Sequence, residues 1–272
     1  MTRLRQGYGG QGRLADTFRG LKARGNGPGL VTYITAGDPD LPRTEGILRA
    51  LDRAGADVVE VGVPFSDPLA DGPVIQRATE RALASGTTLS GVLQMVTRLR
   101  ADLRAPIVIF SYANPILRLG AERFADEATA SGVDGVLVLD LPIEEAGEFR
   151  TLLGDRGIDT ILLLSPTTTD DRLRRAAALG SGFLYAISRL GVTGARDAIA
   201  DGAEDIVRRI RTVSPLPIAL GFGISKPEHV QEVGRWADAA VVGSALVSVI
   251  AEAGASADLN TRVEEYVRWL KS

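Results

Sequence analysis

Residues 58–63 read Val58-Val59-Glu60-Val61-Gly62-Val63, a short β-branched run with one carboxylate inside it. Such a run, without regular polar alternation, is typical of a parallel strand that is covered on both faces. Side chains alternate along a strand, so Glu60 shares a face with Val58 and Gly62, and the other three valines share the opposite face. The valine face suits packing against helices. We therefore expect Glu60 to point inward, where it is either bonded to a neighbouring hydroxyl or arginine, or functional with a raised pKa.

Seven further runs of this kind occur along the chain, separated by longer amphipathic stretches such as 121–131, 144–156 and 226–234. This alternation is the signature of βαβ units and a parallel sheet. Eight strand–helix repeats of one composition favour an α/β fold, a closed (β/α)8 barrel of the TIM type, and a doubly wound open sheet is the alternative. The other seven predicted strands are residues 30–35, 106–111, 135–140, 160–165, 183–188, 217–222 and 239–244.

The domain organisation follows from the same pattern. We expect residues 1–12, with four glycines, to form a flexible leader and residues 13–272 to form one barrel domain. Residues 14–23 have helical spacing and predict an extra helix over the N-terminal end of the barrel. The intervals after the second and sixth strands, the latter at residues 189–203, are longer than a βα unit requires. Because the active sites of such barrels lie on loops that follow strands, these two expanded loops are the candidates for function.

The composition excludes several classes of protein. The net charge is −3 and no run is rich in Lys or Arg, so nothing favours binding to nucleic acid. No apolar run approaches the roughly 18 residues that a membrane span needs, and the N-terminus has no apolar signal core. We therefore expect a cytoplasmic protein without membrane contact.

Three residue types that often carry catalysis are absent or poorly placed. There is no cysteine, and the single histidine, His229, is expected on the polar surface of the helix after the seventh strand. Lys22, Lys226 and Lys271 are the only lysines, and none falls in a predicted strand, which disfavours a Schiff-base aldolase. A metal site would need several histidines or carboxylates close together. The sequence thus predicts no metal and no cofactor, and chemistry carried by carboxylates and hydroxyls on a substrate that supplies its own electron sink.

Asp71 is the second candidate carboxylate. It lies eleven residues after Glu60, in a loop with three prolines that should hold the loop in shape. An Asp-Gly pair often serves only to form a turn. Together with Glu60 on the preceding strand, however, Asp71 could face one ligand at the mouth of the barrel.

Glycine-rich segments after the last three strands indicate a phosphate site. The loops after strands seven and eight, with a helix N-terminus, are the usual phosphate site of such barrels. Glycines let backbone N–H groups approach phosphate oxygens, and Ser244 adds a hydroxyl donor. The segments are Gly191-Val192-Thr193-Gly194, Gly221-Phe222-Gly223-Ile224-Ser225 and Gly243-Ser244.

Over residues 14–270 the chain resembles the tryptophan synthase alpha chains, most specifically in the loop after strand two. The blocks that carry the resemblance are 60–73 (EVGVPFSDPLADGP), 35–39 (TAGDP), 112–115 (YANP), 132–135 (GVDG), 140–142 (DLP), 182–185 (GFLY), 191–194 (GVTG) and 221–225 (GFGIS). The resemblance implies a TIM-barrel lyase that splits indole-3-glycerol phosphate into indole and glyceraldehyde 3-phosphate by a retro-aldol reaction in tryptophan biosynthesis.

The resemblance also implies roles for single residues. Glu60 matches the general acid–base, and Asp71 matches the carboxylate that holds the indole N–H and stabilises positive charge on the ring. Tyr33 stands where many members have an indole-contacting phenylalanine, and Leu139 replaces a common proline. The remaining matches are substrate contacts at Tyr112, Asp140, Tyr185 and Thr193, and a phosphate cradle of Gly194, Gly223, Gly243 and Ser244.

By resemblance the chain is half of an α2β2 heterotetramer. Its partner would be a pyridoxal-phosphate-dependent beta chain that receives indole through a tunnel, contacted by Asp67 and Pro68. Two alternatives are a stand-alone indole-3-glycerol phosphate lyase and a non-catalytic, phosphate-binding regulatory barrel. A sugar-phosphate isomerase would share the phosphate loops, but the loop after strand two favours the lyase.

Overall fold

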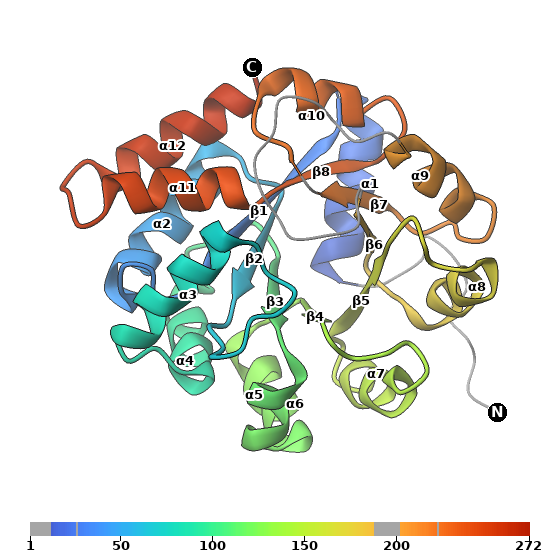
Figure 1. Ribbon diagram of the computed structural model, residues 1–272, viewed down its shortest axis with the longest axis horizontal. Helices are drawn as coiled ribbons and strands as arrows, with labels where there is room; N and C mark the ends of the chain where they lie inside the picture. The colour runs from blue at the N-terminus through green and yellow to red at the C-terminus, as the bar shows by residue number, and fades with distance from the viewer. Residues whose placement is uncertain (1–11, 26, 188–201, 222) are drawn as a thin grey trace.

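The computed structural model describes residues 12–25, 27–187, 202–221 and 223–272. Eight parallel strands form a closed barrel in chain order, β1 to β8, and helices surround it (Figure 1). The strands are β1 (Gly29–Thr35), β2 (Val58–Gly62), β3 (Ile107–Ser111), β4 (Gly135–Val138), β5 (Asp159–Leu164), β6 (Leu184–Ile187), β7 (Ile218–Gly221) and β8 (Ala239–Val242). The predicted closed barrel is confirmed and the open sheet is wrong; the ends of the strands differ from the predicted ones by at most two residues.

Helices follow the strands as the repeat predicts. The interval after β2 holds two of them, α3 and α4, which accounts for its extra length. Residues 188–201, most of the expanded loop after β6, lie outside the described residues, as do residues 1–11 of the expected leader. The helices are α1 (Arg13–Arg24), α2 (Leu41–Ala54), α3 (Pro73–Ala84), α4 (Leu89–Leu99), α5 (Ala113–Leu119), α6 (Ala121–Ser131), α7 (Ala146–Gly154), α8 (Asp170–Leu179), α9 (Ala203–Arg211), α10 (Pro227–Val233), α11 (Ser244–Ala253) and α12 (Leu259–Leu270).

The alternation along β2 sorts its side chains as predicted. Val59, Val61 and Val63 join the apolar layer between barrel and helices. Val58 belongs instead to a second apolar cluster inside the barrel. Glu60 lies on this inner face because it is two residues from Val58.

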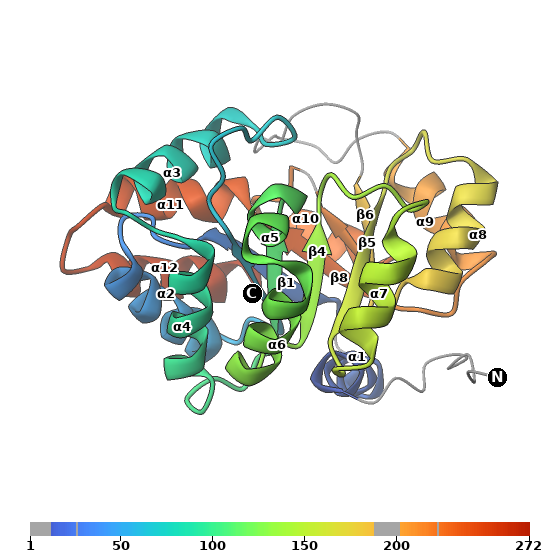
Figure 2. The same cartoon turned by 90° about the horizontal axis from the view of Figure 1, so that it is seen from below.

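The extra N-terminal helix is confirmed. Leu14, Phe18 and Leu21 of α1 pack on the first inward residues of the strands, such as Val31 and Val58. Figure 2 shows α1 across one end of the barrel, away from the end where α3 begins. The helix therefore closes the N-terminal end and leaves the opposite end for ligands.

Side chains at the N-terminal end join the strands in pairs. A residue one to three positions before each even-numbered strand donates its backbone N–H to a carbonyl near the start of the preceding odd-numbered strand. Its side chain accepts the backbone N–H of the residue that carries this carbonyl. Each such pair of residues is called a clamp below. The clamps are Asp57 with Leu30 (2.9 Å), Asp134 with Ile107 (2.8 Å), Ser181 with Thr160 (2.9 Å) and Asp238 with Ile218 (2.7 Å), where the distances are those from backbone N to side-chain oxygen.

His229 corrects an expectation. It was expected on the surface, but only 5% of it is exposed. It lies on the same side of α10 as Val230 and Val233, which are also buried, and its Nδ1 accepts a hydrogen bond from the backbone N–H of Ser225 at 3.3 Å. The histidine thus helps to fix the start of α10. Within the described segments, no helix is both long and apolar enough to cross a membrane.

Candidate active site

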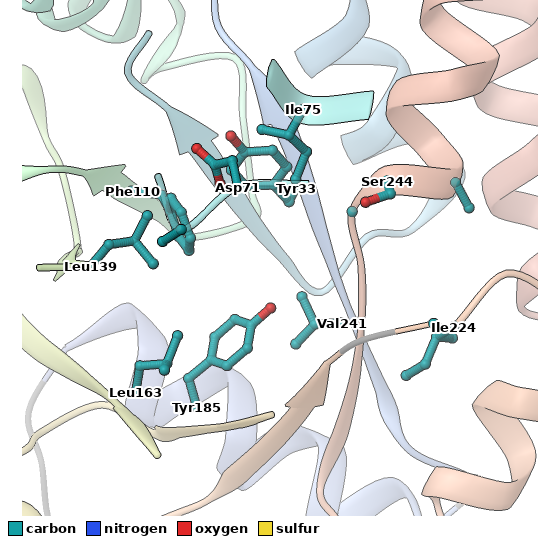
Figure 3. A pocket seen from close by; sticks show the side chains of 14 residues that line it. Tyr33, Asp71, Ile75, Phe110, Leu139, Leu163, Tyr185, Ile224, Val241 and Ser244 are labelled. Carbon is teal, nitrogen blue, oxygen red and sulfur yellow. The ribbon is translucent and has the colours of Figure 1, made fainter. Parts of the chain in front are cut away.

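A cavity opens at the C-terminal end of the barrel (Figure 3). One wall carries Tyr33 and Asp71, the opposite wall carries Tyr185, and Ser244 marks a third side. Fourteen residues line the cavity: Tyr33, Ala70, Asp71, Ile75, Phe110, Leu139, Leu163, Tyr185, Gly223, Ile224, Val241, Gly243, Ser244 and Ala245.

Glu60 lies inside the barrel next to Tyr33, and it is not itself among the residues that line the cavity. Its side chain is 0% exposed, and neither carboxyl oxygen has a hydrogen-bond partner among the described residues. The bonded alternative, with a hydroxyl or an arginine, is therefore not what the described residues form. Burial disfavours the charged carboxylate and raises the pKa of Glu60 to about 8. At neutral pH the group can give up a proton and take one back.

Asp71 is held by a tyrosine from the neighbouring strand. The hydroxyl of Tyr112, directly after β3, donates to Asp71 Oδ2 at 3.1 Å and accepts from the backbone N–H of Ala70 at 3.0 Å. The Gln76 amide donates to the Asp71 carbonyl at 2.9 Å. Burial raises the pKa of Asp71 to about 6, while the hydrogen bond from Tyr112 opposes that rise. The carboxylate is thus ionised at neutral pH and fixed in direction.

Two glycines make room for the two tyrosines of the cavity. A Cβ on Gly62 would lie 2.3 Å from the Tyr33 hydroxyl, and a Cβ on Gly221 would lie 2.5 Å from the Tyr185 hydroxyl. Each tyrosine therefore leans over a neighbouring strand at a position that has no side chain. Burial raises the pKa of both hydroxyls, so they remain hydrogen-bond donors at all physiological pH values.

The side of the cavity at β7 and β8 has the features of a phosphate site. Helix α11 begins at Ser244, and its first turn contains no acidic residue. The unpaired N–H groups of that turn and the helix dipole favour an anion at this end. Gly223 and Gly243 line the cavity beside it, without side chains to block an approaching ligand.

The structure brings together only part of the predicted site. Tyr112 stands behind Asp71 rather than on the cavity surface. Asp140 is exposed and also lies off the cavity surface. Its carboxylate accepts the backbone N–H of Ala113 at 2.6 Å. Thr193 and Gly194 lie outside the described residues. Asp67 is exposed and Pro68 half-buried on the loop that carries Asp71.

The apolar walls were not predicted as part of the site. Phe110, Leu163 and Val241 point inward from β3, β5 and β8, and Ile75 reaches the cavity from α3. Strand parity alone would have identified the first three, because they lie two residues beyond the inward Val108, Ile161 and Ala239. These walls provide a surface for a flat apolar group.

The chemistry available here is proton transfer. None of the three lysines lies on a strand: Lys22 is in α1, Lys226 directly precedes α10, and Lys271 directly follows α12. Among the described residues, no three His, Asp or Glu side chains gather as metal ligands do. The described residues instead place an ionised carboxylate, Asp71, on the cavity wall and a neutral carboxyl group, Glu60, buried on the inner face of β2. The start of α11 adds a helix N-terminus that suits an anion.

A comparison with protein families decides between the readings of this site. The sequence profile described as tryptophan synthase alpha chain matches residues 18–272.

The chain belongs to the tryptophan synthase alpha chain family. Members of this family are the lyase subunits that cleave indole-3-glycerol phosphate in tryptophan biosynthesis. The tryptophan synthase alpha chain of Citrifermentans bemidjiense is 53% identical over 235 residues, which cover 86% of this chain and 88% of that one. That of Solibacter usitatus is 45% identical over 260 residues, with 96% of each chain covered.

Solved structures of tryptophan synthase agree in fold. Mycobacterium tuberculosis tryptophan synthase superposes with a TM-score of 0.88 at 35% identity, covering 96% of this chain and 97% of that one. A structure of the tryptophan synthase α2β2 complex from Pyrococcus furiosus gives a TM-score of 0.82 at 40% identity, covering 89% and 97%. The family thus includes members that assemble with a beta chain.

Proposed function

We propose that this chain cleaves indole-3-glycerol phosphate with Glu60 as the acid–base residue and Asp71 as its electrostatic partner. One observation carries this assignment. Two carboxyl groups of different pKa, about 8 and about 6, stand beside one cavity whose third side is a helix N-terminus. Two titratable groups whose surroundings separate their pKa values are the usual arrangement for divided acid and base roles.

The reaction requires two proton transfers, and Glu60 can perform both. In its neutral form it delivers a proton to C3 of the indole ring, which becomes a positively charged indolenine. The resulting carboxylate then takes the proton from the glycerol hydroxyl next to the ring. The C–C bond breaks, its electron pair returns to the ring to give indole, the hydroxyl carbon becomes the aldehyde, and Glu60 is neutral again.

Asp71 supplies the opposite charge to the indolenine. Its carboxylate is ionised at neutral pH and can accept the indole N–H, which gains positive charge when C3 is protonated. A preorganised charge of this kind stabilises the transition state more than the ground state. Tyr112 fixes the direction of that charge and therefore acts as a positioning residue.

The rest of the cavity orients the substrate. The inward face of Phe110, Leu163 and Val241 suits the flat indole ring, and the start of α11 with Gly223, Gly243 and Ser244 suits the phosphate. Thr193 and Gly194 remain predicted members of the site. Asp140 is a weaker candidate because its carboxylate already accepts the backbone N–H of Ala113, at the start of α5. These contacts would hold the reacting bond between the two carboxyl groups.

Assembly and location complete the proposal. We infer that residues 13–272 form one lyase domain that works in the cytoplasm, within an α2β2 heterotetramer with a beta chain. The loop after β2, with Asp67 and Pro68, is the proposed contact. Asp67 of this loop is exposed, while Asp71 of the same loop lines the cavity. A partner on this loop would thus act directly on the position of a reacting group.

The variant Glu60→Gln tests the assignment. Glutamine keeps the volume of the side chain but neither gives nor takes a proton, so indole formation should fall by at least roughly 10³-fold. Binding of indole-3-glycerol phosphate, measured by calorimetry, should persist within a few-fold. Near-normal turnover in this variant would show that another group transfers the protons.

A further inference from the structure

We propose that the Tyr33 hydroxyl is a positioning group for Glu60, to whose carboxylate it donates a hydrogen bond once the carboxyl has lost its proton. This inference rests on the proposed role of Glu60 as the acid–base residue. It assigns to the hydroxyl a function separate from the contact that the aromatic ring makes with the substrate.

The register of the barrel makes Tyr33 the neighbour of Glu60. Tyr33 pairs with Glu60 across β1 and β2, and Val108 pairs with Glu60 across β2 and β3. All three side chains point into the barrel. Of the two lateral neighbours only Tyr33 has a hydrogen-bond donor, because the valine has none.

Gly62 brings the hydroxyl over β2. A Cβ at this position would lie within 2.3 Å of the Tyr33 hydroxyl, so the tyrosine occupies the space of the missing side chain. Gly62 is the next inward residue after Glu60. The hydroxyl therefore lies over β2 one inward position closer to the C-terminal end than Glu60, at the level where Tyr33 lines the cavity.

Both groups have hydrogen-bonding capacity to spare. The two Glu60 oxygens have no partner among the described residues. The hydrogen bond recorded for the Tyr33 hydroxyl, to Thr35 Oγ1, is 3.5 Å long, the upper limit for such a bond. The Phe110 ring packs edge-on against Tyr33, with centroids 5.0 Å apart, and restricts the ring more than the hydroxyl hydrogen. The hydroxyl hydrogen can thus turn from Thr35 to another acceptor.

The other ionisable groups near this pair lie on other elements. Burial and then the Glu60 charge raise the pKa of Tyr185, which comes from β6, the strand opposite β2 in the ring of eight, and is therefore the rival donor. Asp71 and Tyr112 act on Tyr33 from the loop after β2 and from the end of β3. Tyr33 thus stands between the two carboxyl groups, and the Tyr33→Phe variant can distinguish which of them it serves.

In Tyr33→Phe the Glu60 carboxylate loses a donor to its charged form, so its pKa should rise. The alkaline limb of the kcat/KM profile, where Glu60 loses its proton, should move upward by about one pH unit. The value of kcat at pH 7 should fall roughly tenfold, as expected for a hydrogen bond to a charged group. KM should change less than threefold. The 13C carboxyl resonance that is missing from Glu60→Gln should titrate at higher pH in Tyr33→Phe than in the unaltered chain.

Thr35→Val is the matched control, because it removes the recorded partner of the Tyr33 hydroxyl but keeps the hydroxyl itself. If the hydroxyl served only its bond to Thr35, both variants would change activity alike and neither would move the alkaline limb. That result would overturn the inference. Movement of the acid limb, where Asp71 gains its proton, would also overturn it, as would movement of the alkaline limb in Tyr185→Phe but not in Tyr33→Phe. An active Glu60→Gln would instead overturn the proposed function.

Discussion

Glu60 and Asp71 are both buried carboxyl groups, yet different contacts surround them. Burial alone raises the pKa of Glu60, since no described residue donates to it. Asp71 is buried too, but the Tyr112 hydroxyl stabilises its ionised form and holds the rise in its pKa to about 6. Between pH 6 and pH 8, therefore, the first group is mainly neutral and the second is mainly charged.

The pH dependence of indole formation should follow from these two values. Activity needs neutral Glu60, which is lost as pH rises through about 8, and ionised Asp71, which is lost as pH falls through about 6. A bell-shaped profile of kcat/KM with its plateau between these values is expected. Steady-state assays from pH 5 to pH 9.5 would measure it.

The variant Asp71→Asn identifies the acid limb. Its activity should be lower by roughly 10²-fold or more, and the remaining activity should lose the acid limb but keep the alkaline one. The substrate phosphate also titrates near pH 6. An acid limb that persists unchanged in Asp71→Asn would therefore belong to the substrate, and the role given to Asp71 would be wrong.

Tyr112→Phe should move the acid limb without removing it. Without its donor the Asp71 carboxylate is less stable, so its pKa rises and activity at pH 6 falls by several-fold more than activity at pH 7.5. Kinetics at these two pH values measure the difference. An equal loss at both would mean that Tyr112 supports only the shape of the loop, through the Ala70 N–H.

Among the elements, α11 provides the clearest test, because its N-terminus points at the cavity. Ser244→Ala should raise KM by several-fold with little effect on kcat, since it removes one donor to the phosphate. Ser244→Asp should raise KM much further, because a carboxylate at the helix start repels the phosphate although it suits the helix dipole. Thermal denaturation would check that both variants remain folded. Unchanged KM in both would place the phosphate elsewhere.

Patterns within an element were predictable, and contacts between elements were not. The direction of Glu60 followed from parity along one strand. Tyr112 was predicted as a substrate contact from the family resemblance. Its hydrogen bond to Asp71 was not predicted, because that contact depends on how the loop after β2 folds over β3. His229 was misjudged because its polar neighbours in sequence outweighed the three- and four-residue spacing that aligns helix faces, and Val233, four residues on, is fully buried.

At the scale of the whole molecule, the loop after β2 has two sides with different uses. Leu69, on the outer side, is 88% exposed, more than any other large apolar residue that the structure describes. Asp71, two residues on, lines the cavity. A beta chain that covers Leu69 would also restrain Asp71, so activity should be low for the isolated chain and much higher in the complex.

Leu69→Ser should weaken binding to the beta chain by roughly tenfold or more, the effect of losing one buried leucine from an interface. Titration of the variant with a beta chain, followed by indole formation, measures the concentration for half-maximal activation. Leu83→Ser is the matched control, since Leu83 is 39% exposed at the other end of α3. Equal shifts in both variants would argue against a contact at this loop.

The clamps at the N-terminal end divide the barrel into quarters, each made of two strands. A cut between β4 and β5 leaves both clamps of each half intact, Asp57 and Asp134 in one piece and Ser181 and Asp238 in the other. A cut between β3 and β4 separates Asp134 from Ile107. Co-expressed halves divided at the first position should therefore reassemble more readily than those divided at the second. The two-strand units joined by the clamps are thus the natural segments to exchange when this chain is recombined with other barrels.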